Sequence, residues 1–169
     1  GPLLVLLHGR SETRSLEAGA HAWRDAYDLE LARRRLTKPP LNAEDFKELV
    51  THKTLAMFNR QLQSSPYRGI RILCPYTPDL IRDTHKSPAL IDFARFISKE
   101  LLPTAAKLSG GLPAAVQTGI DGVSLGGRLA LLIGLSHPER FGAVSGMQPA
   151  LSSQEAAYFA NLAIDAHKI

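Results

Sequence analysis

Four short and nearly continuous apolar runs alternate with longer stretches in which apolar residues recur at helical spacing. The runs are too short for helices, and turn-forming residues such as glycine, proline and aspartate follow them. Continuous apolar runs of this length are typical of strands buried on both faces of a parallel sheet. The pattern predicts strands at Leu3–Leu7, Gly69–Cys74, Ala114–Ile120 and Phe141–Val144.

Helical patterns fill the gaps between the predicted strands. Two helices separate the first strand from the second, and one helix follows each later strand, an order that predicts a parallel sheet layered with helices. Asn42 is placed to cap the second helix and Ser152 or Ser153 the last one, while residues 103–116 are expected to form a loop or broken helix. The predicted helices are Trp23–Arg35, Ala43–Gln63, Pro88–Leu102, Leu125–Ser136 and Ser153–His167.

The composition indicates one soluble globular domain. The chain has 169 residues, 44% of them hydrophobic and 21% charged, which is enough for a sizeable core. Its 20 Lys and Arg residues against 16 Asp and Glu give a mild net charge of +4 without a basic tract, which argues against nucleic acid as a partner. No run approaches the roughly 20 apolar residues that span a bilayer. We also expect no signal peptide and no membrane partner; the compartment is left open, with the cytoplasm favoured.

The chain contains a single cysteine, Cys74. One cysteine excludes an internal disulfide and any cysteine-rich metal site. Because Cys74 lies in an apolar run, we expect it to be a small buried hydrophobic residue.

The segment Gly122–Gly127, with the sequence Gly-Val-Ser-Leu-Gly-Gly, connects the third predicted strand to an apolar helix. A serine on so tight a turn is pushed out above the sheet edge, at the positive end of the new helix. The strained backbone needs residues without a Cβ two positions before and after the serine, and Gly122 and Gly126 supply them. Gly127 allows the helix to pack close to its strand. These features predict Ser124 as a nucleophile; the alternative is a glycine-rich turn of an unrelated doubly wound protein.

His8, Gly9 and Arg10 follow the first predicted strand directly. The amide of Leu125, the residue after the serine, is expected to point to the place where negative charge develops on an attacked carbonyl. A turn at Gly9 is expected to present the amide of Arg10 as a second donor, so that Leu125 and Arg10 form an oxyanion hole. We predict that His8 is buried and fixes this loop by hydrogen bonds.

Three stretches resemble the putative-esterase branch of the α/β-hydrolase superfamily, which includes enterochelin-esterase-like, esterase-D-like and feruloyl-esterase-like proteins. The likeness rests on Leu-Leu-His-Gly at 6–9, on Gly-Val-Ser-Leu-Gly-Gly-Arg-Leu-Ala-Leu at 122–131, and on the His-Pro-x-x-Phe pattern that begins at His137. The stretches that carry it are Pro2–Arg10, Ile70–Asp79 and Gly119–Leu151.

The resemblance implies a three-layer α/β-hydrolase-type sandwich with a mostly parallel sheet. It also implies a serine carboxylic-ester hydrolase that forms an acyl-enzyme on Ser124, with a small-molecule ester as substrate and no metal or organic cofactor. We expect a single domain over 1–169, with a helical insertion at about 20–64 that covers the site or forms a partner surface. From their position we expect an acyl pocket at Met147, Gln148 and Leu151, and core roles for Trp23, Tyr27 and Phe58.

The acid and base of a catalytic triad are missing from the expected places. In such hydrolases the order is Ser, then Asp or Glu, then His. His8 precedes the serine, so it is an unsuitable base. Asp165 and His167 fall in a predicted helix, and His137 at a helix end is expected to be structural. The remaining histidines precede the serine and are expected on the surface or in loops; they are His21, His52 and His85.

The chain is therefore expected to be a fragment, incomplete at both ends, with its acid and base on other residues. Two alternatives remain open: one chain of a two-part protein, or a degenerate member that binds a partner or small molecule without catalysis. Within enzymes, an acyltransferase or a peptidase on the same scaffold is the further alternative, because water, alcohol and amine acceptors look alike at this level.

Overall fold

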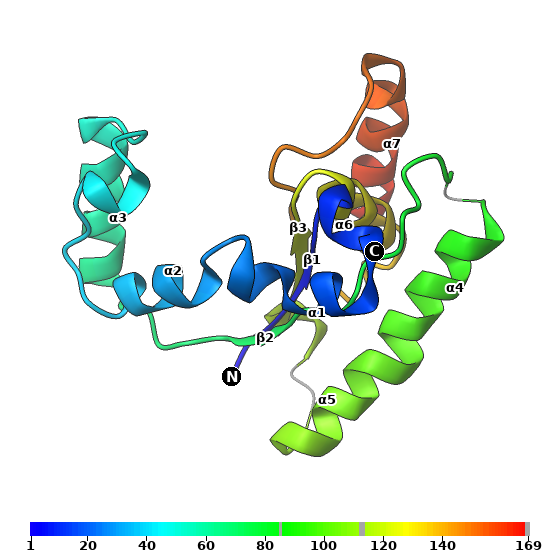
Figure 1. Cartoon of the computed structure of the whole chain (residues 1–169), viewed down its shortest axis with the longest axis horizontal. Helices are drawn as coiled ribbons and strands as arrows, with labels where there is room; N and C mark the ends of the chain where they lie inside the picture. Colours follow the sequence, from blue (N-terminus) through cyan, green and yellow to red (C-terminus); the bar gives the residue numbers. More distant parts are fainter. Residues whose placement is uncertain (85, 112–113, 168–169) are drawn as a thin grey trace. The chain divides into compact units, whose positions relative to one another are not determined.

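A computed structural model describes residues 1–84, 86–111 and 114–167 (Figure 1). His85, predicted to lie on the surface or in a loop, is outside the described residues, as are residues 112–113 of the predicted loop. The contacts divide the chain into two compact units, which are described separately: Gly1–Ala22 with Ile70–Ile169, and Trp23–Gly69. The predicted single domain with an insertion at about 20–64 stays a prediction.

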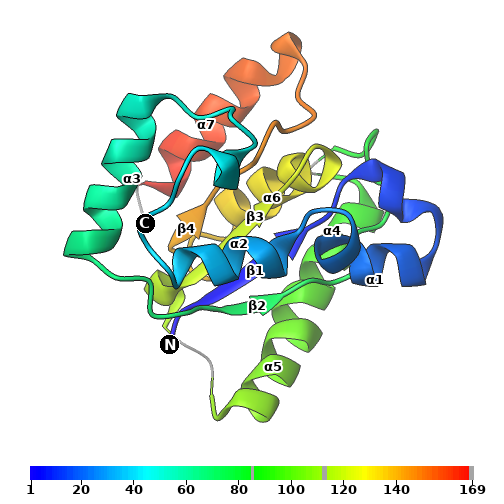
Figure 2. The same cartoon turned by 60° about the vertical axis from the view of Figure 1, so that its left-hand side comes forward.

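The first unit is built on a parallel sheet with strand order β2-β1-β3-β4 (Figure 2). All of the pairings are parallel, which confirms the predicted α/β fold. The strands are β1 (Leu3–Leu7), β2 (Arg71–Leu73), β3 (Thr118–Gly122) and β4 (Ala143–Val144).

The third strand is shifted along the chain from its predicted place. It was expected over Ala114–Ile120, but residues Ala115–Gln117 form a 3-10 turn and the strand runs on to Gly122. Pairing decides these bounds, because β1 offers partners as far as Leu7, which lies opposite Gly122. The last strand residue is therefore the first glycine of the serine motif.

Helix α6 (Leu125–Ser136) covers one face of this sheet and contacts β1, β3 and β4. Its Gly134 lies so close to the strands that a Cβ there would be 2.7 Å from the Ile120 side chain and 2.6 Å from that of Val144. The core joins alternate residues of β1 to α6 and to α4 (Pro88–Phe96). Its members include Leu3, Val5, Leu7, Leu90, Phe93, Ile97, Ile120, Leu125, Leu129, Leu132 and Ile133.

Two further helical segments extend the first unit. A π-helical turn (Ile97–Leu101) and α5 (Leu102–Ser109) continue α4 as one rod (Figure 1). Part of residues 103–116, predicted to be a loop or broken helix, is therefore helical. Pro103 lies in the first turn of α5, just after the π-helical turn. A 3-10 turn (Ser153–Glu155) and α7 (Ala156–Ala166) form the predicted last helix, and Ser152 forms a capping box with Glu155.

Both helices predicted between Trp23 and Gln63 differ from the helices in the structure. Instead of one helix over Trp23–Arg35, α1 (Leu16–Asp25) and α2 (Leu29–Leu36) are separated at Asp28, which has a positive φ of 51°. Instead of one helix over Ala43–Gln63, a short 3-10 turn (Glu44–Phe46) precedes α3 (His52–Ser64).

The second break has a clear local cause. Lys47 and Glu48 adopt positive φ angles of 50° and 62°, which end the turn, and the hydroxyl of Thr51 accepts a hydrogen bond from the amide of Thr54 to cap α3. Asn42 caps only the short turn, by accepting a hydrogen bond from the amide of Asp45 at 3.1 Å.

The aromatic residues of this region pack in local pairs. Trp23 is buried and lies against Tyr27, with ring centroids 4.9 Å apart, and Phe46 stacks on Phe58 at 5.8 Å. Tyr27 and Phe58 are half-buried, so the expected core role holds fully only for Trp23.

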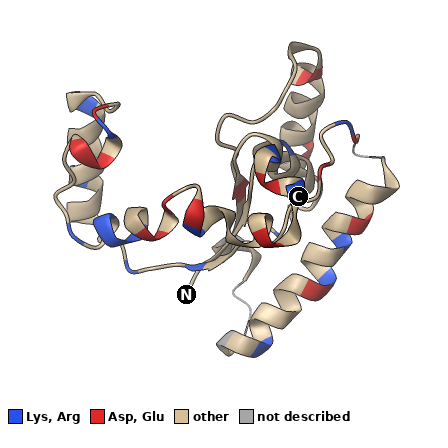
Figure 3. Ribbon diagram, viewed as in Figure 1, with Lys and Arg blue, Asp and Glu red and all other residues tan. Residues whose placement is uncertain are grey.

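Charged side chains of both signs follow one another along the helices, as seen on α4 and the turn after it (Figure 3). In the part of the chain that the structure describes, no helix combines the length and apolar character needed to cross a membrane.

Candidate active site

Ser124 lies between the end of β3 and the first residue of α6. Its backbone has φ 55° and ψ −114°, a conformation that residues with a Cβ rarely adopt. A residue held in such a region costs on the order of 1–3 kcal/mol, which the surrounding contacts must offset. The side chain is exposed while its neighbour Leu125 is buried, so the turn presents the hydroxyl to solvent at the carboxyl edge of the sheet.

The glycines around Ser124 are packed against backbone, with no room for a side chain. A Cβ on Gly122 would lie 2.7 Å from the carbonyl oxygen of Leu7 and closer still to Gly126. A Cβ on Gly126 would collide with the carbonyl of Leu7 and lie 2.6 Å from that of His8. A Cβ on Gly127 would be 2.9 Å from the carbonyl oxygen of Gly122. The first turn of α6 is therefore pressed against the ends of β1 and β3.

Main-chain hydrogen bonds fix the serine between two strand ends. The amide of Ser124 donates to the carbonyl of Met147 at 3.0 Å, and the carbonyl of Ser124 accepts from Ala150 at 2.9 Å. The amide of the preceding Val123 donates to Leu7 at 3.1 Å. The segment after β4, where the acyl pocket is predicted, is thus beside Ser124, and its Met147 and Leu151 side chains are exposed.

The two predicted oxyanion donors follow neighbouring strands. Arg10 opens a 3-10 turn (Arg10–Arg14) after β1, with Gly9 as its N-cap, and Leu125 opens α6 after β3. Neither amide donates a backbone hydrogen bond to another described residue. Because β1 and β3 pair in parallel, both amides lie at the same sheet edge as the serine, as an oxyanion hole requires.

His8 is fully buried and both of its ring nitrogens are used. Nε2 accepts a hydrogen bond from the amide of Thr77 at 2.8 Å, and Nδ1 donates to the carbonyl of Gly9 at 2.8 Å. Burial lowers the pKa of His8 below its usual value, the carbonyl of Gly9 and the charge of Glu12 acting in the opposite direction. The predicted role as a buried, loop-fixing residue is confirmed, and a neutral ring with both nitrogens engaged does not act as the base.

An ion pair that the sequence did not reveal lies next to Arg10. Its Nε donates to the carboxylate of Asp79 at 2.9 Å, with both side chains partly exposed. This hydrogen bond is the main reason that the pKa of Asp79 is lowered. Asp79 lies in the segment after β2, and a strand order with β2 beside β1 is the signal that would have predicted the pair.

The candidate acid and bases lie away from the serine. His137 ends α6, which at 12 residues is about 18 Å long, so it lies at the opposite end from Ser124; its Nδ1 is 3.4 Å from Glu139. His167 ends α7 and lines a hollow with Gly134 and Pro138, near that same distant end. Asp165 is exposed on the last turn of α7.

The other two described histidines are exposed on helices. His21 lies on α1 and His52 begins α3. Among the described residues, no histidine forms a hydrogen bond with the hydroxyl of Ser124, and no cluster of three His, Cys, Asp or Glu side chains is arranged to hold a metal ion.

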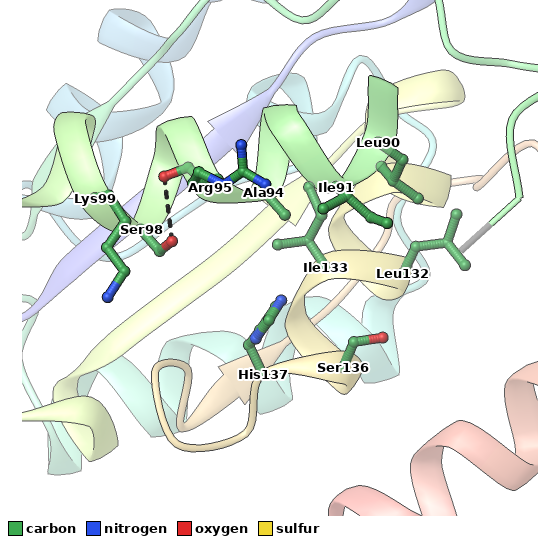
Figure 4. A pocket seen from close by; sticks show the side chains of 10 residues that line it. All are labelled: Leu90, Ile91, Ala94, Arg95, Ser98, Lys99, Leu132, Ile133, Ser136 and His137. Carbon is green, nitrogen blue, oxygen red and sulfur yellow. Dashed lines mark hydrogen bonds between the residues drawn. The ribbon is translucent and has the colours of Figure 1, made fainter. Parts of the chain in front are cut away.

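A separate hollow of about 330 Å³ lies between α4 and α6 (Figure 4). Ser124 does not line it, so this hollow is not the place where an ester would meet the serine. Its lining residues are Leu90, Ile91, Ala94, Arg95, Ser98, Lys99, Leu132, Ile133, Ser136 and His137.

Comparison with known proteins found a family model and a solved structure that are similar to this chain. Residues 81–163, which include Ser124 and α6, match the family model described as Putative esterase. No curated protein matches the chain. A solved structure of a ferulic acid esterase superposes with a TM-score of 0.51 and 20% sequence identity, over 98% of this chain and 55% of that one.

The structural likeness shows the fold, and the chain spans about half the length of that solved protein. The segment matched by the family model includes the serine turn. The chain thus resembles the putative-esterase family over residues 81–163 and shares the fold of the solved esterase.

Proposed function

We propose that this chain carries the nucleophile part of a serine carboxylic-ester hydrolase, with Ser124 as the nucleophile. The observation that carries the proposal is the backbone of Ser124, held at a positive φ of 55° between β3 and α6 with its side chain exposed. A strained turn that costs stability and presents a hydroxyl is expected where that hydroxyl performs chemistry. The match of residues 81–163 to an esterase family supports the same activity.

In the proposed reaction the Oγ of Ser124 attacks the carbonyl carbon of an ester. A new C–O bond forms, the carbonyl oxygen becomes an oxyanion, and the hydroxyl proton passes to a base. Collapse of the tetrahedral intermediate expels the alcohol, which takes up the proton, and leaves an acyl group on Ser124. Water then repeats the sequence on the acyl-enzyme and releases the acid.

The amides of Leu125 and Arg10 are assigned to the oxyanion. Both are backbone donors without a backbone acceptor among the described residues, and both follow strands that end at the serine's edge of the sheet. Loss of one such donor typically lowers the rate by on the order of a hundredfold or more. The proposal assigns the base to a histidine beyond the described residues, because both ring nitrogens of His8 are engaged and His137 lies at the far end of α6.

A non-catalytic binding module on the same scaffold is the second candidate. The observation in its favour is that no described histidine contacts the Ser124 hydroxyl. A serine without a base would keep the turn and its exposed hydroxyl but would not be activated.

The two candidates differ in the reactivity of Ser124 toward a fluorophosphonate probe. The full-length protein is incubated with the probe and its intact mass is measured, beside Ser124→Ala and a matched control, Ser136→Ala, which removes an exposed hydroxyl from the other end of α6. The hydrolase predicts one probe per chain in the starting protein and in Ser136→Ala, and none in Ser124→Ala. A folded protein that takes up no probe would overturn the hydrolase and leave the binding module.

A further inference from the structure

Arg128 is a buried cation one helical turn after the nucleophile. It lies in the first half of α6, its amide donates to the carbonyl of Ser124 at 3.0 Å, and its exposed fraction is 6%. A buried charge is costly unless it is paired. The partners of Arg128 therefore indicate what its burial achieves.

Those partners come from two separate segments. One guanidinium nitrogen, Nη1, forms an ion pair with the carboxylate of Glu155, in the turn that leads into α7. The other, Nη2, donates to the carbonyl of Asp83, in the segment after β2, at 3.3 Å. The guanidinium also lies over the ring of Phe159, 5.8 Å from its centroid. One side chain of the nucleophile helix thus joins the segment after β2 to the segment after β4.

Both segments flank the candidate active site. The segment after β4 contains Met147 and Ala150, the main-chain hydrogen-bonding partners of Ser124. The segment after β2 contains Thr77, bonded to His8, and Asp79, bonded to Arg10. Both segments follow strands that end at the sheet edge where Ser124 lies, so a shift of either segment is expected to alter the surroundings of the serine.

Glu155 is held in place by hydrogen bonds that do not involve Arg128. Its carboxylate accepts hydrogen bonds from the amide and the hydroxyl of Ser152, at 3.0 and 2.9 Å. The ion pair therefore connects two fixed points, α6 and the capping box of the following helix. Such an arrangement sets the distance between α6 and the turn before α7, whereas an ion pair between two mobile surface side chains would not.

Stability alone does not account for a buried arginine here. Buried ion pairs are often replaceable by well-packed apolar side chains with no loss of stability, and the Nε of Arg128 is buried without a hydrogen-bond partner among the described residues. The charge is better explained by the geometry that its two partners impose.

We propose that Arg128 is a positioning residue that sets the distance between the segments after β2 and β4, and so determines how large an ester Ser124 accepts. This inference rests on the proposed hydrolase function. It names a determinant of specificity and leaves the chemical step to Ser124 and the two amides.

The test compares two fluorophosphonate probes, one with a small alkyl group and one with a bulky aryl group. The measured quantity is the ratio of their labelling rates. Arg128→Met removes the contacts with both Glu155 and Asp83 and is expected to change this ratio by roughly tenfold. A change of this size is expected when a wall of a site moves by a fraction of an ångström or more. Arg128→Lys keeps a charge for Glu155 and is expected to fall between the two proteins. Glu155→Gln is expected to shift the ratio in the same direction.

The control is Arg95→Met, which removes an exposed arginine paired with Asp92 on α4 and should leave the ratio as it is. A ratio unchanged in Arg128→Met, whether or not both rates fall, would overturn the inference. Circular dichroism identifies a variant that fails to fold; in that case Arg128→Lys and Glu155→Gln decide the outcome.

Failure of the proposed function has a different signature, since the starting protein would then label with neither probe. Hydrogen exchange tests the positioning role in that case. Residues 79–84 and 147–155 should exchange faster in Arg128→Met than in the starting protein, with β1 and β3 unaltered. If the two segments exchange at the same rate in Arg128→Met as in the starting protein, the positioning role is overturned, whatever the labelling results.

Discussion

The imidazole Nε2 of His8 accepts a hydrogen bond from the backbone amide of Thr77, 69 residues along the chain, at 2.8 Å. The same two residues are joined a second time, because the amide of His8 donates to the hydroxyl of Thr77 at 3.1 Å. The end of β1, which carries the Arg10 amide, is thereby tied to the segment after β2. A neutral histidine is required for this arrangement, since a protonated ring has no acceptor nitrogen.

This bond predicts how stability depends on pH. The pKa of His8 in the folded protein is lowered, mainly by burial, so the unfolded chain takes up the proton more readily, near its ordinary value of about 6.5. The contribution of His8 to the free energy of unfolding is complete above about pH 6.5 and is lost as the pH falls below it. Thermal melts between about pH 8 and 5 should show this loss.

The control for that prediction is a second histidine. His21 is exposed on α1, so His21→Gln should keep the pH dependence of the melting temperature. His8→Gln, which offers an amide in place of the ring, should be less stable at pH 8 and should have a flatter profile below about pH 6.5. Parallel profiles for His8→Gln and the starting protein would contradict the assignment.

Two glycines of the same strand should respond differently to a methyl group. In Gly122→Ala the new Cβ meets the backbone of Leu7 and Gly126, which have nowhere to move. In Gly119→Ala it meets the tip of the Leu4 side chain at 3.1 Å, which is able to rotate. Overpacking against rigid atoms costs about 1–3 kcal/mol or more, so Gly122→Ala should lower the urea midpoint well beyond Gly119→Ala. Equal midpoints would contradict the close approach of α6 to β1.

The oxyanion role of Arg10 can be separated from its ion pair. Arg10→Pro deletes the amide hydrogen, and proline suits the first position of the 3-10 turn because the preceding Gly9 is extended, with φ −74° and ψ 179°. Arg10→Ala keeps the amide and removes only the contact with Asp79. The proline variant should label with fluorophosphonate roughly a hundredfold more slowly.

The alanine variant supplies the comparison. The exposed pair of Arg10 and Asp79 should contribute less than about 1 kcal/mol to stability, so Arg10→Ala should melt near the starting protein and label far faster than Arg10→Pro. Similar labelling rates in the two variants would exclude the Arg10 amide from the oxyanion hole.

Cys74 is expected to be a slow nucleophile. Burial raises the pKa of its thiol to about 11, and the side chain is half-buried at the end of β2, less than the full burial expected from its apolar surroundings. Since the thiolate is the reactive form, a pKa of about 11 in place of the ordinary thiol value of 9.0 implies a roughly hundredfold smaller thiolate fraction at pH 8. Iodoacetamide should modify the native protein much more slowly than the protein in urea; equal rates would contradict this.

The parts of the fold that depend on neighbouring residues could be predicted from the sequence. Apolar runs located all four strands, although pairing with β1 moved the third strand to Thr118–Gly122. The prediction of two long helices between Trp23 and Gln63 was wrong, because positive φ angles at Asp28, Lys47 and Glu48 interrupt them. None of these three residues is a glycine, so no residue type marked the breaks.

At the candidate site the same division applies. The strained Ser124 turn and its glycines follow from a motif of six consecutive residues, in which each position constrains the backbone of the next. The pairs of Arg10 with Asp79 and of Arg128 with Glu155 were not expected. The two residues of each pair are distant in the chain. Without the order of the strands, the sequence does not indicate which of its many arginines and carboxylates lie next to each other.

The sequence by itself indicated the family resemblance, the parallel order of strands and helices, and the serine on which the chemistry is proposed to depend. These are local properties, because strand burial and a tight glycine turn are encoded within a few residues. Only the tertiary structure decided that His8 is a neutral, fully bonded support and that Arg128 is buried between two segments. The physical reason is that burial, and with it the protonation of a histidine and the value of an ion pair, depends on which distant segments come together.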